Sequence, residues 1–190
     1  MKESSIYGLV LAGGKSTRMG RDKGLIQYHR KPQREHLFDL LTKFCEKVFT
    51  SCRKEQEILM SLHPIWDKFD FESPLNGILS ACDQHPEKGW LAVAVDMPFV
   101  TEDVLKFLIS ERDQTKAATC FYDSDGKFPE PLLTIWEPSA FLLLREFHSK
   151  GGISPREFLM ENDCKKLTYF NSQIHVNINT VGDIERLRTQ

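Results

Sequence analysis

Apolar positions along the chain form short continuous runs that alternate with sets at helical spacing. Residues 6–11 and 90–95 are nearly continuous apolar runs, which is typical of strands buried on both faces of a parallel sheet. Between these runs, helical spacing relates Leu37, Leu40, Leu41, Phe44 and Val48. A strand, a helix and a further buried strand in this order predict an α/β fold.

The alternation continues toward the middle of the chain. Strands are predicted at residues 48–51 and 66–71, and a helix is predicted at residues 78–84. Thr101 can cap the next helix, because its apolar neighbours have the spacing of a hydrophobic staple. The inner face of that helix is predicted to carry Val104, Leu105, Leu108 and Ile109. Helices between buried strands are expected to cover both faces of the sheet.

The second half of the chain contains a predicted antiparallel pair of strands. Residues 117–122 and 132–136 flank the turn sequence Asp-Ser-Asp-Gly at residues 123–126. Two capping patterns indicate later helix starts: Ser154 with Pro155 and Glu157, and Thr180 with Asp183. The predicted fold is a single-domain, three-layer α/β/α sandwich over residues 1–190, with a mostly parallel, Rossmann-like sheet and an antiparallel insertion.

Composition narrows the classes of protein to which this chain can belong. It has 190 residues, of which 41% are apolar and 27% are charged, the balance of an ordinary globular protein. Lys and Arg number 25 against 27 Asp and Glu, so the net charge of -2 provides no general attraction for nucleic acid or an anionic membrane. No apolar run approaches the ~20 residues of a membrane span. We expect no nucleic-acid partner and no membrane partner.

Cysteine spacing bears on the compartment in which the protein works. The five cysteines are widely spaced and include no C-x-x-C pair: Cys45, Cys52, Cys82, Cys120 and Cys164. This pattern argues against a disulfide framework and against a zinc site. A reducing, cytoplasmic location fits best.

A glycine-rich segment follows the first predicted strand and reads Leu-Val-Leu-Ala-Gly-Gly-Lys-Ser-Thr-Arg-Met-Gly over residues 9–20. A Walker phosphate-binding loop that ended in the Gly-Lys-Ser of residues 14–16 would need its first glycine at position 9, where the chain has Leu9. A dinucleotide fingerprint also fails, because the glycines lie at positions 13, 14 and 20. Neither of these phosphate-binding motifs describes the segment.

The same segment nevertheless has the chemistry of an anion site. Its glycines let backbone amides approach a ligand, and four cationic side chains follow: Lys15, Arg18, Arg21 and Lys23. Asp96 comes directly after the strand predicted at residues 90–95, so both features are expected at the carboxyl edge of the sheet, where ligands bind. A carboxylate that faces a polyphosphate is tolerated chiefly when a divalent cation lies between them, which predicts Mg²⁺ at Asp96.

Simpler interpretations remain open from these residues alone. The glycine segment can be an ordinary strand-to-helix turn with solvated basic residues, and Asp96 can be a turn cap before Pro98. The six histidines lack the spacing of metal ligands. Trp66, Trp90 and Trp136 are most simply core or sheet-packing residues.

Residues 11–20, followed by Asp22 and Lys23, resemble the L-A-G-G-x-S-x-R-M-G-x-D-K signature of the molybdenum cofactor guanylyltransferases, the MobA-like nucleotidyltransferases. Residues 96–99 are similar to the D-M-P-F segment of that family, and residues 177–180 to its N-x-N-T segment. These matches span most of the chain, and the first is specific to nucleotidyltransferases of this superfamily. The resemblance implies a nucleotide-diphospho-sugar-transferase-like fold, in which residues 1–100 bind the nucleotide and residues 101–190 bind the acceptor.

The resemblance also implies roles for single residues on the nucleotide side. It implies that Lys23 binds phosphates, that Arg18 orders the loop or assists the phosphates, and that Asp96 holds Mg²⁺. Backbone groups would contact a guanine nucleotide at Leu11, Ala12, Gly13 and Gly14. Residues 74–78 resemble a G-P-L-A-G-I segment that closes over the nucleotide and includes Gly77, with Ser73 and Asn76 in place of glycine and alanine.

Two further positions depart from the family pattern. The family places an aspartate near the guanine shortly before the G-P-L-A-G-I segment, and the candidate here is Asp70, at a shorter interval than usual. At the end of the second strand, where the family often has asparagine, this chain has Ser51 and Cys52. On the acceptor side, a cleft lined by Arg156, Asn177 and Asn179 is expected, with Arg156 as a phosphate ligand. Each of these three also has a simpler interpretation, as a solvated or backbone-bonding side chain.

Three functions follow, in order of preference. The first is transfer of GMP from GTP to the phosphate of molybdopterin, which forms molybdopterin guanine dinucleotide and pyrophosphate with Mg²⁺. The second is a sister reaction, cytidylyl transfer to molybdopterin or guanylyl transfer to cobinamide phosphate, although Leu-Ala-Gly-Gly favours guanine within the resemblance. The third is a nucleotide-binding regulatory protein without turnover, against which an intact Lys23 and Asp96 argue. The implied partners are GTP, a molybdopterin-type acceptor and, transiently, enzymes that make or receive the molybdenum cofactor.

Overall fold

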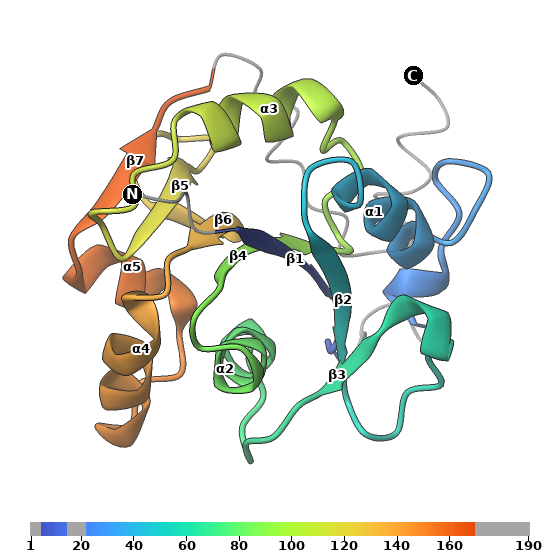
Figure 1. Ribbon diagram of the computed structural model, residues 1–190, viewed down its shortest axis with the longest axis horizontal. Coiled ribbons are helices and arrows are strands. Elements are labelled where there is room, and N and C mark those ends of the chain that lie inside the picture. The colour runs from blue at the N-terminus through green and yellow to red at the C-terminus, as the bar shows by residue number, and fades with distance from the viewer. Residues whose placement is uncertain (1–4, 15–21, 170–190) are drawn as a thin grey trace.

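The structure is a computed structural model that describes residues 5–14 and 22–169 (Figure 1). The strands in this part of the chain are β1 (Ile6–Leu11), β2 (Lys47–Cys52), β3 (Pro64–Trp66), β4 (Gly89–Ala94), β5 (Ala118–Tyr122), β6 (Pro129–Trp136) and β7 (Cys164–Leu167). They form a 7-stranded sheet in the order β3-β2-β1-β4-β6-β5-β7. β6 is antiparallel to its neighbours β4 and β5, and the other pairs are parallel. Both halves of the chain therefore contribute strands to one sheet.

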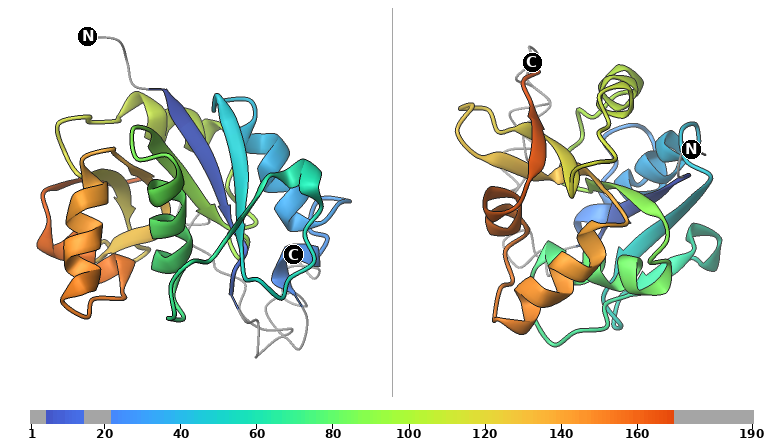
Figure 2. Two further views of the ribbon diagram at one scale, coloured as in Figure 1. Left: turned by 60° about the horizontal axis from the view of Figure 1, so that its bottom comes forward. Right: turned by 60° about the vertical axis from the view of Figure 1, so that its left-hand side comes forward.

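Helices cover the two faces of this sheet: α1 (Gln33–Leu41), α2 (Pro74–Gln84), α3 (Glu102–Ser110), α4 (Ala140–Ser149) and α5 (Pro155–Glu161). Figure 1 shows α1 and α3 on one face and α2, α4 and α5 on the other. The turned views in Figure 2 show α2 and α4 packed side by side. This arrangement confirms the predicted three-layer sandwich and its antiparallel insertion. Among the residues described, no helix combines the length and apolar character that a membrane crossing requires.

Each face of the sheet has its own apolar core. Successive residues of a strand point to opposite faces, so Leu9 of β1 packs in the core beneath α2, and Val10 packs in the core beneath α1. Ala92 and Leu91 of β4 divide between the same two cores, and all four side chains are buried. Burial on both faces explains why the central strands consist of continuous apolar runs.

The third strand lies earlier than the sequence predicts. A strand is expected at residues 66–71, whereas β3 ends at Trp66 and residues 67–71 form the loop that leads to α2. Phe69 and Phe71 of this loop are partly buried against the core beneath α2. The loop therefore contains apolar residues in a pattern that predicts a strand. Trp66 itself is 42% exposed on the edge strand and is not a core residue.

Helix boundaries follow local caps more closely than apolar spacing. α2 begins at Pro74 rather than at residue 78, because Ser73 Oγ accepts a hydrogen bond from the backbone N–H of Leu75 and proline fits the first turn. α1 ends at Leu41, and Val48 belongs to β2 although its spacing suggests the helix.

The other predicted caps can be compared directly. Thr101 and Ser154 each accept a backbone hydrogen bond in the first turn of α3 and α5, which confirms both predicted helix starts. The start predicted at Thr180 lies outside the described residues.

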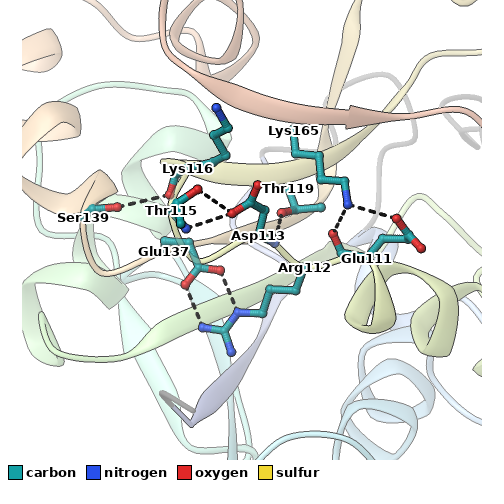
Figure 3. A network of polar contacts seen from close by, with 9 residues as sticks. All are labelled: Glu111, Arg112, Asp113, Thr115, Lys116, Thr119, Glu137, Ser139 and Lys165. Atoms are coloured by element: carbon teal, nitrogen blue, oxygen red, sulfur yellow. Dashed lines mark hydrogen bonds and ion pairs between the residues drawn. The ribbon is translucent and has the colours of Figure 1, made fainter. Parts of the chain in front are cut away.

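A buried ion pair ties α3 to the sheet, at the edge opposite the carboxyl ends of β1 and β4 (Figure 3). Arg112, just after α3, donates from Nε and Nη2 to the two carboxylate oxygens of Glu137, each at 2.7 Å. The two side chains are only 8% and 1% exposed. Gly89 at the start of β4 leaves room for the guanidinium, because a Cβ at this position would lie 2.7 Å from Arg112 Nη2. The pair therefore fixes the end of α3 against the ends of β4 and β6.

Loss of one partner of this buried pair should cost more stability than loss of one partner of an exposed pair. We expect Glu137→Ala to lower the free energy of unfolding by about 3–5 kcal/mol, because it leaves the Arg112 charge buried without its counterion. Asp163→Ala is the control: it breaks the pair with Lys116, in which the Asp163 side chain is 79% exposed, and should change stability far less. Urea denaturation measures both changes, and equal losses would contradict the role given to Glu137.

Candidate active site

A cleft of about 1120 Å³ opens at the carboxyl edge of the sheet. Its walls come from the ends of β1 and β4, the loops that follow β2 and β3, and the first turn of α2. Many of the residues singled out from the sequence line it: Leu11, Ala12, Gly13, Gly14, Lys23, Asp70, Gly77 and Asp96. Arg156 is not part of this lining, and Arg18, Asn177 and Asn179 lie outside the described residues.

The glycine segment leaves β1 at the base of the cleft. Ala12 N donates to Ser51 O at 2.9 Å, so the chain stays bonded to β2 up to the first glycine. A Cβ on Gly13 would lie 3.0 Å from Asp67 Oδ2, a contact tighter than side chains normally make. Glycine at this position therefore lets a carboxylate lie directly beside the backbone of the loop.

Gly77 allows α2 to approach the sheet at the cleft. A Cβ at this position would lie 2.0 Å from Ser51 Oγ and 2.9 Å from Ser51 Cβ, which no side chain could tolerate. The first turn of α2 consequently packs on the end of β2. The amino end of this helix, with its partial positive charge, borders the cleft through Pro74 and Asn76.

Lys23 and Asp96 meet across the cleft. Lys23 Nζ lies 3.7 Å from Asp96 Oδ2, and the two side chains are 17% and 18% exposed. Burial raises the pKa of Asp96, and the charge of Lys23 acts in the opposite direction. Asp96 Oδ1 is buried without a hydrogen-bond partner in the part of the chain described. A hard oxygen ligand with one oxygen unused fits a divalent cation.

The segments that carry these two residues are held in place from outside the cleft. Asp22 Oδ1 accepts from Gly24 N at 2.8 Å and so begins the short 3₁₀ helix Lys23–Leu25. His29 Nε2 lies 2.8 Å from Pro98 O, in hydrogen-bond range, which joins the segment after Lys23 to the segment after Asp96. The separation of the lysine and the aspartate is therefore set by local bonds on both sides.

Asp67 is a cleft residue that the sequence reasoning missed. It follows β3 directly, as Asp96 follows the end of β4, and its backbone N–H donates to Cys52 O at 2.9 Å. Ser51 Oγ donates to Asp67 Oδ1 at 3.4 Å. Burial raises the pKa of Asp67 to about 6, with Ser51 acting in the opposite direction. An aspartate at the end of a strand could have been recognised from the sequence. The strand predicted at residues 66–71 placed Asp67 inside the strand instead.

The loop between Asp67 and α2 is organised by one amide side chain. Asn76 Nδ2 donates to Phe69 O at 2.7 Å and to Phe71 O at 2.9 Å, and Asn76 Oδ1 accepts from Phe69 N at 3.2 Å. Asn76 stands where the resembled segment has alanine, and these bonds give the departure a physical reason. Asp70 lies on the same loop as an exposed cleft residue, whereas Asp67 is partly buried.

Arg156 lies against β6 rather than in the cleft lining. Its Nη2 is 3.9 Å from Glu130 Oε2, and its side chain is 44% exposed. Glu130 is buried, and burial raises its pKa, while a hydrogen bond from Leu132 N to Oε1 at 2.9 Å acts in the opposite direction. Leu132 lines the cleft, so Arg156 is connected to the cleft lining through Glu130 without being part of it.

The fold and the cleft together are typical of an α/β nucleotide-binding protein: a mostly parallel sheet whose carboxyl edge presents glycines, a lysine and a largely buried aspartate. Residues 8–165 match the family model of the MobA-like NTP transferase domain, and the chain belongs to this family. The resemblance drawn from the motifs is thereby confirmed.

Individual relatives agree with this assignment. The chain is 36% identical over 186 residues to a molybdenum cofactor biosynthesis bifunctional protein of Synechocystis sp., covering 96% of this chain but only 54% of that protein. It is 28% identical to a molybdenum cofactor guanylyltransferase of Histophilus somni, with 96% of each chain covered. The solved structure of molybdopterin-guanine dinucleotide biosynthesis protein A from Archaeoglobus fulgidus superposes with a TM-score of 0.76 at 25% identity, over 95% of each chain.

Asp67 should make stability depend on pH in a characteristic way. Its pKa is raised from 3.8 to about 6 in the folded protein, so folding favours the protonated form, and the free energy of unfolding should fall as pH rises from about 4 through about 6. The asparagine in Asp67→Asn does not titrate, so the stability of this variant relative to wild type should increase as pH rises from about 4 through about 6. Urea denaturation at several pH values measures the gap.

Asp70→Asn, on the same loop, controls for the general loss of one negative charge. A wild-type minus Asp67→Asn difference that is constant between pH 4 and about 7 would show that Asp67 does not titrate as its burial implies.

Proposed function

We propose that this protein transfers GMP from GTP to the terminal phosphate of a molybdopterin-type cofactor and releases pyrophosphate. The observation that carries the proposal is the meeting of Lys23 and Asp96 at 3.7 Å beside the glycine segment, because nucleotidyl transfer needs a cation and a metal ligand at the same phosphates. Membership of the MobA-like NTP transferase domain family and the names of its relatives support the choice of reaction.

The chemistry requires alignment and charge neutralisation more than proton transfer. An oxygen of the acceptor phosphate attacks the α-phosphorus of GTP, the bond from that phosphorus to the β-phosphate oxygen breaks, and pyrophosphate leaves. The nucleophile is already anionic near neutral pH, so the site needs no general base. Backbone amides of the glycine segment and the ammonium of Lys23 would hold the triphosphate in line for this attack. Arg18, from the same signature, is assigned the same supporting role by resemblance.

Mg²⁺ is the cofactor that this proposal requires, and Asp96 is the residue that would hold it. The fit rests on the chemistry of the donor, since Asp96 offers a buried carboxylate oxygen with no hydrogen-bond partner among the described residues. When bound, the cation supplies charge neutralisation for the phosphates during transfer. Lys23 Nζ lies 3.7 Å from the same carboxylate, so its ammonium would be close to the phosphates that the cation neutralises.

Guanine is the base that the cleft fits best under this proposal. Backbone groups of residues 11–13 and the carboxylate of Asp67 line one side of it. Guanine presents two adjacent donors, N1–H and N2–H, which a carboxylate can accept together, whereas adenine and cytosine do not present this pair. Asp67 is therefore assigned the base contact, with Asp70 as the neighbouring candidate at the rim. Gly77 leaves the space that α2 needs to border the same pocket.

The acceptor side of the proposal rests on the second half of the chain. Arg156 would bind the acceptor phosphate, with Asn177 and Asn179 assigned to the same side by their N-x-N-T match. The proposed setting is the cytoplasm, where enzymes that make or receive the molybdenum cofactor would be transient partners. Nothing in the proposal requires nucleic acid or a membrane.

A nucleotide comparison tests the reaction and the base together. With Mg²⁺ and a molybdopterin acceptor, GTP should release pyrophosphate with a kcat/KM at least ~10-fold above that for CTP or ATP, because only guanine satisfies the Asp67 carboxylate. Mass spectrometry should identify a guanine dinucleotide product. Equal turnover with CTP would favour the sister reaction, and nucleotide binding without any pyrophosphate release would favour a regulatory protein.

Lys23→Ala should lose roughly 100-fold in kcat/KM for GTP, about 2.7 kcal/mol of transition-state stabilisation, because the developing phosphate charge loses its ammonium. The same variant should bind Mn²⁺ more tightly than wild type when no nucleotide is present, since Lys23 no longer competes for Asp96. Electron paramagnetic resonance measures free Mn²⁺. Lys15→Ala is the matched control and should lose only a few-fold in kcat/KM; a larger loss for Lys15→Ala would support the Walker interpretation of the segment instead.

A further inference from the structure

One side chain that no motif singles out, that of Gln56, contacts both Ala12 and Asp22. Gln56 lies in the loop after β2, and its Nε2 donates to Ala12 O at 2.9 Å and to Asp22 Oδ2 at 3.1 Å. Its Oε1 accepts from Arg53 N at 2.8 Å. Ala12 stands directly before Gly13 and Asp22 stands directly before Lys23, so one amide group contacts the residues on either side of positions 13–21.

We propose that Gln56 is a positioning residue that holds Ala12 relative to Asp22 and thereby sets the distance between the backbone amides of Gly13 and Gly14 and the ammonium of Lys23. The inference deepens the proposed function and rests on it, because it assigns the segment to the nucleotide phosphates. Gln56 itself does not touch the reacting atoms in this assignment. It acts through Ala12 and Asp22.

The chemistry of the three contacts explains why glutamine occupies this position. Ala12 O and the Asp22 carboxylate can only accept hydrogen bonds, and Arg53 N can only donate one. A primary amide supplies two N–H donors and one carbonyl acceptor, so it satisfies all three partners at once. Glutamate has nearly the same shape, but when ionised it has no donor and would face two acceptors. The position therefore distinguishes between two side chains of equal size.

The link matters because Asp22 connects directly to the cationic end of the site. Asp22 Oδ1 accepts from Gly24 N at 2.8 Å, and Asp22 Oδ2 lies 3.4 Å from Arg34 Nη1. These two bonds hold Asp22 to the segment after it and to α1. Gln56 is the contact that ties it to β1, through Ala12. Without Gln56, Ala12 and Asp22 remain attached to different elements, and the distance between them is set less tightly.

A fixed separation between Ala12 and Asp22 lowers the entropy that nucleotide binding must remove. Phosphate oxygens have to meet the amides of Gly13 and Gly14 and the Lys23 ammonium simultaneously, and the Gln56 contacts restrict the relative positions of these groups before binding. The loss of two hydrogen bonds, one to a backbone carbonyl and one to a carboxylate, should therefore appear in nucleotide affinity. Affinity for the acceptor should not change, because the segment lies on the nucleotide side of the cleft.

The experiment compares Gln56→Glu with Gln114→Glu, which adds the same charge at an exposed position outside the cleft lining. We expect Gln56→Glu to raise the Kd for Mg²⁺–GTP by about 10-fold, the effect of roughly 1.4 kcal/mol, as measured by calorimetry. The KM for GTP should rise in parallel while the KM for the acceptor stays within twofold of wild type. Gln114→Glu should match wild type in both. Gln56→Ala, which introduces no charge, should show a smaller rise in the GTP Kd.

Each result bears on a separate claim. A Gln56→Glu variant that binds GTP as tightly as Gln114→Glu would overturn the positioning role. An equal rise in the KM for GTP and for the acceptor would also overturn it. So would a loss of folded structure, measured by circular dichroism, in both Gln56→Glu and Gln56→Ala. Wild-type protein that binds GTP but releases no pyrophosphate would refute the proposed function and leave the positioning role standing on the binding data. Wild-type protein that binds no nucleotide would overturn both.

Discussion

Parallel pairing of β1 with β2 and β4, and of β2 with β3, brings Leu11, Ser51, Ile65 and Ala94 to the same level at one edge of the sheet. Because these strands run in the same direction, the residues that follow them leave the sheet side by side. The backbone of Ala12 and the carboxylates of Asp67 and Asp96 line one cleft for this reason, although they come from distant parts of the sequence. The remaining features of the site depend on this shared edge.

Charge is handled differently at the two ends of the sheet. At the opposite edge, Arg112 and Glu137 satisfy each other with two bonds of 2.7 Å and are almost fully buried, so the pair serves stability. At the cleft, Lys23 lies 3.7 Å from one oxygen of Asp96, and the other oxygen has no hydrogen-bond partner among the described residues. Burial without full compensation is typical of sites where a ligand completes the set of contacts. This contrast favours a binding role for the cleft pair.

Side-chain amides replace strand pairing in the loops around the cleft. Buried backbone groups in a loop need partners, and an amide offers donors and an acceptor in one group. Asn76 bonds to three backbone groups of Phe69 and Phe71 and so shapes the loop that carries Asp67. Gln56 joins the backbone of Ala12 to the carboxylate of Asp22. The loops at the cleft are thus held by an amide from α2 and by an amide from the loop after β2.

The sequence by itself determined the fold class and part of the site. Continuous apolar runs and apolar residues at helical spacing show which faces of each element are buried. The glycine segment, Lys23 and Asp96 are recognisable from their order and spacing in the sequence. Only the tertiary structure decided which strand ends lie together. β3 stops after Trp66, where its pairing with Cys52 at the end of β2 stops, and this places Asp67 beside Gly13. The short β7, the pairing of Arg156 with Glu130 and the bridge made by Gln56 likewise depend on contacts between distant segments, which a local pattern of residues does not record.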